Sequence, residues 1–196
     1  IESPLRLSST SFAENATGTV VGDLSVDDSD NPDFTANVTY TLSGTDAASF
    51  EVVNGQLKLK DNVSADFETK NTYSITITAT DDANHEASLT YSLQVTDAND
   101  APTAIALSAS VFDENTAGAV VGTLSTSDVD AGDTHTYELS GTDADSFEVV
   151  NGQLKLKDSV TANYETQSSY SVTVTATDSG SLTTTQVFTV NVNNLN

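Results

Sequence analysis

The chain of 196 residues is strongly acidic, because 29 Asp and Glu residues against 6 Lys and Arg residues give a formal net charge of −23 at pH 7. This charge repels nucleic acid and anionic membranes and attracts cations, so we expect no nucleic-acid partner. The absence of Cys excludes disulfides and thiolate metal sites. No apolar run is long enough for direct membrane insertion, and no signal peptide begins at Ile1. We therefore expect a fragment from inside a longer chain.

The sequence contains two copies of one unit. Ser43–Asp61 and Ser140–Asp158 are identical at 18 of 19 positions. The other parts of the two copies also align, apart from three extra residues within 31–38 of the first copy. A period of about 100 residues is too long for a solenoid repeat and indicates a duplicated domain. We therefore predict two domains, residues 1–99 and 100–196.

Each copy is predicted to consist of strands. Those of the first copy lie, in chain order, at Leu5–Ser8, Thr19–Ser25, Thr39–Leu42, Phe50–Val53, Gln56–Lys60, Tyr73–Thr80 and Leu89–Val95. They are rich in β-branched residues and alternate apolar with polar positions, as half-buried strands do. The pair Asn54-Gly55 is typical of a type I′ hairpin turn. Seven short strands in about 100 residues predict an all-β fold of two tandem seven-stranded Greek-key β-sandwiches.

Two further patterns recur in both copies. Aromatic residues at matching strand positions are expected in the core rather than on a binding platform: Phe12, Phe50, Tyr73 and Tyr91, repeated as Phe112, Phe147, Tyr170 and Phe188. Lysines at alternate positions of one strand are interpreted as a solvated face that guards a sheet edge, rather than a ligand-binding stripe: Lys58, Lys60, Lys155 and Lys157.

Acidic residues are concentrated between the predicted strands and around the hexapeptide Asp97-Ala98-Asn99-Asp100-Ala101-Pro102. Loops gather at the ends of a sandwich, so one end of each copy is expected to contribute acids to this joint: Glu14, Asp66, Glu68, Asp97, Asp100, Asp128, Asp130 and Asp178. An Asp/Asn-rich loop that binds nothing is the alternative for the hexapeptide by itself. Two carboxylates about 4 Å apart repel by ~1 kcal/mol even in water, so the whole set requires cations. Oxygen ligands favour Ca²⁺ over Zn²⁺, and flexible carboxylates suit Ca²⁺ better than Mg²⁺.

In order and spacing these motifs resemble the calcium motifs of tandem cadherin repeats, and the resemblance covers essentially the whole chain. It implies cadherin/Ig-like domains joined end to end by a linker that holds about three Ca²⁺. The implied ligands are Glu14, Asp66, Glu68, Asp97, the Ala98 carbonyl, Asn99, Asp100, the Ala101 carbonyl, Asp128, Asp130 and Asp178. Asp28, Asp30 and Asp81 form a candidate half-site that a preceding repeat would complete. At the far end of the second copy Asn163 and Asn194 replace two of the acids, so only part of a site is expected there.

The resemblance implies a calcium-dependent rigid spacer or adhesion module from the repeat array of a large cell-surface or secreted adhesin, whose parent protein is membrane-associated. The repeats are rich in Thr, Asp and Asn, and in this they resemble the cadherin-like repeats of large bacterial surface proteins. This resemblance implies an extracellular location on the bacterial outer surface. The expected partners are neighbouring repeats of the same chain. The alternative is a module that binds carbohydrate or a like repeat on another cell, with Phe34, Phe67 and Tyr164 as candidate contact aromatics. We expect no enzyme, because the only histidines, His85 and His135, are at non-equivalent loop positions and are expected to face solvent.

Overall fold

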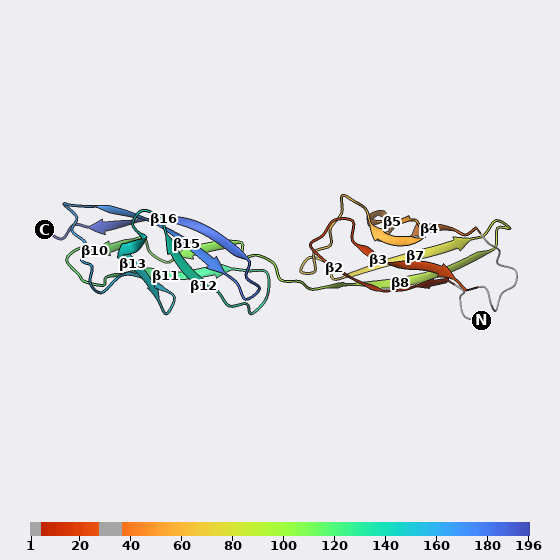
Figure 1. Cartoon of the computed structure of the whole chain (residues 1–196), viewed down its shortest axis with the longest axis horizontal. Helices are drawn as coiled ribbons and strands as arrows, with labels where there is room; N and C mark the ends of the chain where they lie inside the picture. Colours follow the sequence, from red (N-terminus) through yellow and green to blue (C-terminus); the bar gives the residue numbers. More distant parts are fainter. Residues whose placement is uncertain (1–4, 28–36) are drawn as a thin grey trace. The chain divides into compact units, whose positions relative to one another are not determined.

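The computed structural model describes residues 5–27 and 37–196 of the chain. It divides the chain into two compact units, Ile1–Ala98 and Asn99–Asn196. Each unit is a sandwich of two four-stranded sheets (Figure 1). This confirms the predicted all-β fold of two tandem β-sandwiches. Among the described residues, no helix combines the length and the apolar character needed to cross a membrane.

In the first unit, one sheet has the strand order β1-β3-β6-β5 and the other β2-β8-β7-β4. The bounds are β1 Leu5–Leu7, β2 Ser11–Ala13, β3 Val20–Val26, β4 Thr39–Ser43, β5 Phe50–Val53, β6 Gln56–Leu59, β7 Thr72–Thr80 and β8 Glu86–Thr96. A short 3₁₀ helix, η1 (Ala47–Ser49), connects β4 to β5. Neighbouring strands pair antiparallel, except that β2 pairs parallel with β8.

The second unit repeats this topology, with sheets β9-β11-β14-β13 and β10-β16-β15-β12. The bounds are β9 Ala104–Leu107, β10 Val111–Asp113, β11 Val120–Ser127, β12 Thr136–Ser140, η2 Ala144–Ser146, β13 Phe147–Val150, β14 Gln153–Leu156, β15 Ser169–Thr177 and β16 Thr183–Asn193. Here β10 pairs parallel with β16, as β2 does with β8. The sequence duplication is therefore also a duplication of topology.

Alternation along the strands determines which face of each sheet is buried. In β7 the side chains of Ile75, Ile77 and Ala79 are completely buried, while the Ser and Thr residues between them are more exposed. Each core contains an aromatic trio with ring centroids about 6 Å apart: Phe12, Phe50 and Tyr73 in the first unit, and Phe112, Phe147 and Tyr170 in the second. These six residues confirm the predicted core. Tyr91 and Phe188 are only partly buried and pack against its rim.

The structure has one more strand per unit than predicted, because the first strand is divided between the two sheets. Leu5–Leu7 pairs with β3, and the chain then crosses to the other sheet, where Ser11–Ala13 pairs with β8. The crossing passes very close to β3. A Cβ on Gly22 would lie 2.7 Å from the hydroxyl oxygen of Ser8 and 2.8 Å from the amide nitrogen of Ser9. This close approach explains why glycine follows the Val-Val pair.

The interpretation of the lysines as guards of a sheet edge is wrong. Strands β6 and β14 each lie between two other strands, so neither is an edge. Lys58 forms ion pairs with Glu51 and Asp61. In the second unit Lys155 forms the corresponding ion pairs with Glu148 and Asp158. The Lys155 side chain is only 17 % exposed, so it lies along the sheet instead of extending into solvent. Ion pairing with Glu148 of β13 and with Asp158 in the turn after β14 accounts for its position.

Candidate metal centre

Glu14 follows β2 and organises the end of the first unit from which the chain leaves. Its side chain is buried, with 4 % of the residue exposed. One carboxylate oxygen accepts a hydrogen bond from the amide of Phe67 at 2.5 Å, and the other accepts one from the amide of Ala98 at 2.8 Å. Glu14 therefore links the Asp66-Phe67-Glu68 loop to the chain exit.

Two further acids lie beside Glu14. Ligand atoms of Glu14, Glu68 and Asp97 all lie within 4.8 Å of one another, which is close enough for one cation to contact all three. Asp66 is directed differently, since it is exposed and accepts a hydrogen bond from the amide of Thr69 at 2.8 Å. Of the four acids predicted to bind metal at this end of the first unit, the structure thus brings three together, and Asp66 lies in the same loop as Glu68.

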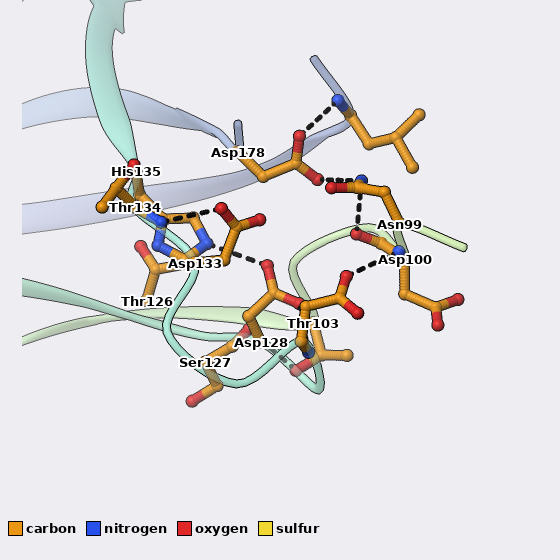
Figure 2. Close-up of polar contacts among 12 residues, drawn as sticks. Asn99, Asp100, Thr103, Thr126, Ser127, Asp128, Asp133, Thr134, His135 and Asp178 are labelled. Atoms are coloured by element: carbon orange, nitrogen blue, oxygen red, sulfur yellow. Dashed lines mark hydrogen bonds and ion pairs between the residues drawn. The ribbon is translucent and has the colours of Figure 1, made fainter. Parts of the chain in front are cut away.

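In the second unit the acidic end is built around Asp178, which follows β15. One oxygen of this buried carboxylate accepts a hydrogen bond from the amide of Leu182 at 2.8 Å. The other accepts one from the side-chain amide of Asn99 at 2.9 Å, and the same amide group donates to the carbonyl of Asp100 at 3.0 Å (Figure 2). Asp178 therefore fixes the side chain of Asn99, which is 79 residues away in sequence.

Gly180 leaves room for this arrangement. A Cβ at residue 180 would lie 2.3–2.5 Å from three side-chain atoms of Asn99, which is closer than any such atoms approach. The corresponding residue of the first unit is Ala83. Glycine at 180 is therefore required by the contact with Asn99.

The remaining predicted acids of this end form a hydrogen-bonded series. The amide of Asp100 donates to Asp130 at 2.7 Å, and the amide of Asp130 donates to Asp128 at 3.2 Å. Ala101 is exposed and precedes the buried Pro102. Every predicted ligand from Asn99 onward is thus in the joint or in a loop of the second unit, and hydrogen bonds connect the side chains of Asp130 and Asp178 to the joint.

Asp133 and His135 also lie at this end of the second unit, although the sequence did not predict them there. Ligand atoms of Asp128, Asp133 and His135 lie within 4.8 Å of one another. Hydrogen bonding from Ser179 holds the pKa of Asp133 below its ordinary value, so its carboxylate stays ionised. The expectation that His135 faces solvent is wrong, because its side chain is only 11 % exposed and contacts Asp128.

A signal for these two residues is present in the sequence. Gly132 has a φ of +89°, and the amide of Asp133 donates to the carbonyl of Asp130, which closes a turn. A Gly in an Asp-Ala-Gly-Asp segment indicates such a turn. The turn directs the following residues back toward Asp128.

The candidate half-site of the first unit is only partly described. Asp28 and Asp30 lie outside the described residues. Asp81, the counterpart of Asp178, is buried and accepts hydrogen bonds from the amides of Ala83 and His85 at 2.9 and 2.7 Å. Its second oxygen contacts the His85 ring at 3.0 Å, where Asp178 instead contacts Asn99. The His85 side chain is 49 % exposed, as expected for this residue.

At the far end of the second unit Glu114 repeats the contacts of Glu14. It is 2 % exposed and accepts hydrogen bonds from the amides of Tyr164 and Leu195 at 2.9 and 2.8 Å. These two bonds lower the pKa of Glu114. This end has fewer acidic residues than the end around Glu14, since Asn163 and Asn194 occupy the positions of Asp66 and Asp97. The structural role of this glutamate is therefore retained without the full acidic set.

Comparison with known proteins assigns the family. A model of the cadherin domain matches residues 8–96 and 108–193, which is most of the chain. The chain belongs to the cadherin family. Cadherin domains are extracellular adhesion domains without enzymatic activity, and they typically bind Ca²⁺ at the linkers between domains.

Individual relatives are distant. The cadherin pair is 26 % identical over 170 residues to Protocadherin Fat 1 of Homo sapiens, covering 83 % of this chain and 4 % of that protein. The crystal structure of human Protocadherin-24 EC1-2 matches with a TM-score of 0.68 and 20 % identity, over 100 % of this chain and 99 % of that one. A Protocadherin gammaB7 EC3-6 cis-dimer structure matches with a TM-score of 0.58 and 25 % identity, over 97 % of this chain and 48 % of that one. The Protocadherin-24 match supports the fold alone, and the alignment with Fat 1 spans only 4 % of the length of that protein.

The donor set fits a hard divalent cation. The acidic end of the first unit offers carboxylates, and that of the second offers carboxylates and the side-chain amide group of Asn99. Ca²⁺ takes six to eight oxygen ligands in flexible geometry, whereas Zn²⁺ is typically bound by sulfur and nitrogen. The buried Glu14 and Asp178 are already oriented by main-chain or side-chain amides. The residues present can therefore hold calcium.

Proposed function

We propose that these two cadherin repeats form a calcium-dependent rigid spacer of a cell-surface or secreted adhesin. About three Ca²⁺ would be held where the repeats join, by the residues of both acidic ends. The ligands would be Glu14, Asp66, Glu68, Asp97, the Ala98 carbonyl, Asn99, Asp100, the Ala101 carbonyl, Asp128, Asp130 and Asp178. Three Ca²⁺ would supply six positive charges against eight carboxylates.

One observation carries this proposal: the residues on each side of the boundary are hydrogen-bonded to their own unit, so no unattached linker lies between the two repeats. The amide of Ala98, the last residue of the first unit, donates to Glu14, and Asn99 and Asp100 bond to Asp178 and Asp130 of the second. A Gly/Ser linker would allow free movement, whereas this joint has none of those residues. Cations shared by the carboxylates on both sides would therefore determine how far one repeat can move relative to the other.

Ambient calcium would then regulate stiffness. Extracellular calcium modules bind with Kd of roughly 10⁻⁴–10⁻³ M, and each site at tenfold excess over Kd adds about 1.4 kcal/mol to stability. The resemblance of the repeat sequences to those of bacterial surface proteins supports such a protein as the parent. That part of the proposal rests on the sequence alone.

Calorimetric titration of the chelated chain with Ca²⁺, combined with small-angle scattering, tests the spacer. We expect about three ions per chain and a broader distribution of inter-domain distances in chelator. Asp100→Ala is expected to broaden the distribution even at saturating Ca²⁺. Asp145→Ala is the matched control, because it removes the same charge at an exposed position where the first copy already has Ala48. Scattering that chelator leaves unchanged would rule out a calcium-stiffened joint.

A homophilic adhesion module is the second candidate. It is favoured by family membership and by the likeness to a protocadherin structure described as a cis-dimer. Bead aggregation with and without Ca²⁺ tests it, and a glycan array tests carbohydrate binding. Of the aromatics suggested for a glycan site, Phe67 packs against the core, Tyr164 is 38 % exposed, and Phe34 lies outside the described residues. Aggregation of coated beads only in Ca²⁺ would support adhesion over spacing alone.

A further inference from the structure

His135 lies in the loop between β11 and β12 and contacts an acid of the candidate metal centre. Its Nε2 atom is 2.9 Å from Oδ2 of Asp128 (Figure 2). A carboxylate only accepts hydrogen bonds, so Nε2 carries the hydrogen and donates it. The two side chains are 11 % and 5 % exposed, which shields the contact from water. Asp128 is thus held on one oxygen by His135 and on the other by the amide of Asp130.

Without such a contact, the neighbouring carboxylates would repel the carboxylate of Asp128. Asp133 lies in the same cluster, and the joint attaches to Asp130 two residues from Asp128. Unpaired carboxylates at these distances turn away from one another when no cation is bound. A donor on the side of Asp128 compensates part of the repulsion and keeps the side chain in one orientation. Donors of this kind behind a metal-binding carboxylate tune affinity because they orient the ligand before the ion arrives.

The first repeat has no histidine at the position that corresponds to His135. Pairing of β4 with β7 and of β12 with β15 aligns Thr39 with Thr136, so the residue that corresponds to His135 is Val38. Val38 is apolar and packs against the core of the first unit. The two repeats therefore differ in residue type at this position, although the sequence of their hairpins is nearly identical.

We propose that His135 is a positioning residue that orients Asp128 for the divalent cation held by the acidic end of the second repeat. This inference rests on the proposed function, since it assumes that Asp128 binds Ca²⁺. It assigns to the histidine no direct contact with the ion. Its consequence is that the affinity for calcium depends on a residue outside the ligand set.

Calorimetric Ca²⁺ titration of the full chain, with melting measured in chelator, tests the inference. His135→Phe keeps a ring but removes the donor, and we expect one of the bound ions to lose about 10- to 100-fold in affinity. His135→Gln retains an N–H that can reach Asp128, and its affinity is expected to stay near the wild-type value. His85→Phe is the matched control, because His85 makes a like contact with Asp81, which is not among the ligands proposed for the joint. It should leave the affinity unchanged.

The possible results separate the inference from the function on which it rests. A wild-type chain that binds no Ca²⁺ overturns the proposed function and this inference together. A wild-type chain that binds Ca²⁺, with affinity unchanged in His135→Phe, overturns the inference alone, even if that variant melts at a lower temperature in chelator. Equal loss of affinity in His135→Gln and His135→Phe also overturns it, because the donor would then not be the cause.

Discussion

The close contact between Gly180 and Asn99 gives the sharpest prediction. In Gly180→Ala the new Cβ would lie 2.3–2.5 Å from the Asn99 side chain, so Asn99 must move. Its amide then loses the hydrogen bonds to Asp178 and to the carbonyl of Asp100. The bond to a charged group contributes about 1.5–3 kcal/mol and the neutral one about 0.5–1.5 kcal/mol, of which water restores a part because Asn99 is exposed.

We therefore expect Gly180→Ala to destabilise the second repeat by about 1–3 kcal/mol in chelator. For a domain of this size that loss lowers the melting temperature by about 5–15 °C. Thermal and urea unfolding measure the change. The first repeat provides an internal reference, because Ala83 already occupies the corresponding position there.

A double-mutant cycle with Asn99→Ala distinguishes this contact from a general effect of alanine. Once Asn99 is truncated, nothing remains for the Cβ at residue 180 to meet at 2.3–2.5 Å. Gly180→Ala should then be neutral, or stabilising by about 0.4–1 kcal/mol through the lower entropy of the unfolded chain. If Gly180→Ala costs as much in the Asn99→Ala background as in the wild type, the steric explanation is refuted.

Two other predictions concern the second repeat. Leu154 is completely buried in the core, so Leu154→Ala should cost about 2–5 kcal/mol in urea unfolding, and a cost below about 1 kcal/mol would contradict the packing. Main-chain bonds from Tyr164 and Leu195 lower the pKa of Glu114, so the stability that its ionised form contributes is present above the pKa of the unfolded chain and is lost as the pH falls. Glu114→Gln should therefore be less stable than the wild type at pH 7, with a difference that shrinks between about pH 5 and pH 3. A difference independent of pH would argue against this role of Glu114.

Local patterns were sufficient to predict most of the fold. The alternation that places Ile75 and Ile77 in the core repeats every two residues, and a Pro or Asn-Gly pair marks the turns. Both signals act over a few residues, so they can be read without knowing the tertiary structure. The division of the first strand was missed because Ser11–Ala13 is too short for a periodic signal and exists through its pairing with β8.

The sequence by itself determined the duplication, the all-β class and the residue types at the joint, because these depend on composition and on short-range periodicity. Only the tertiary structure decided which acids contact which partners. Asn99 reaches Asp178 across 79 positions, and His135 turns inward to Asp128 instead of facing solvent. Such contacts depend on the path of each loop, which is determined by packing between distant segments and has no period of its own in the sequence.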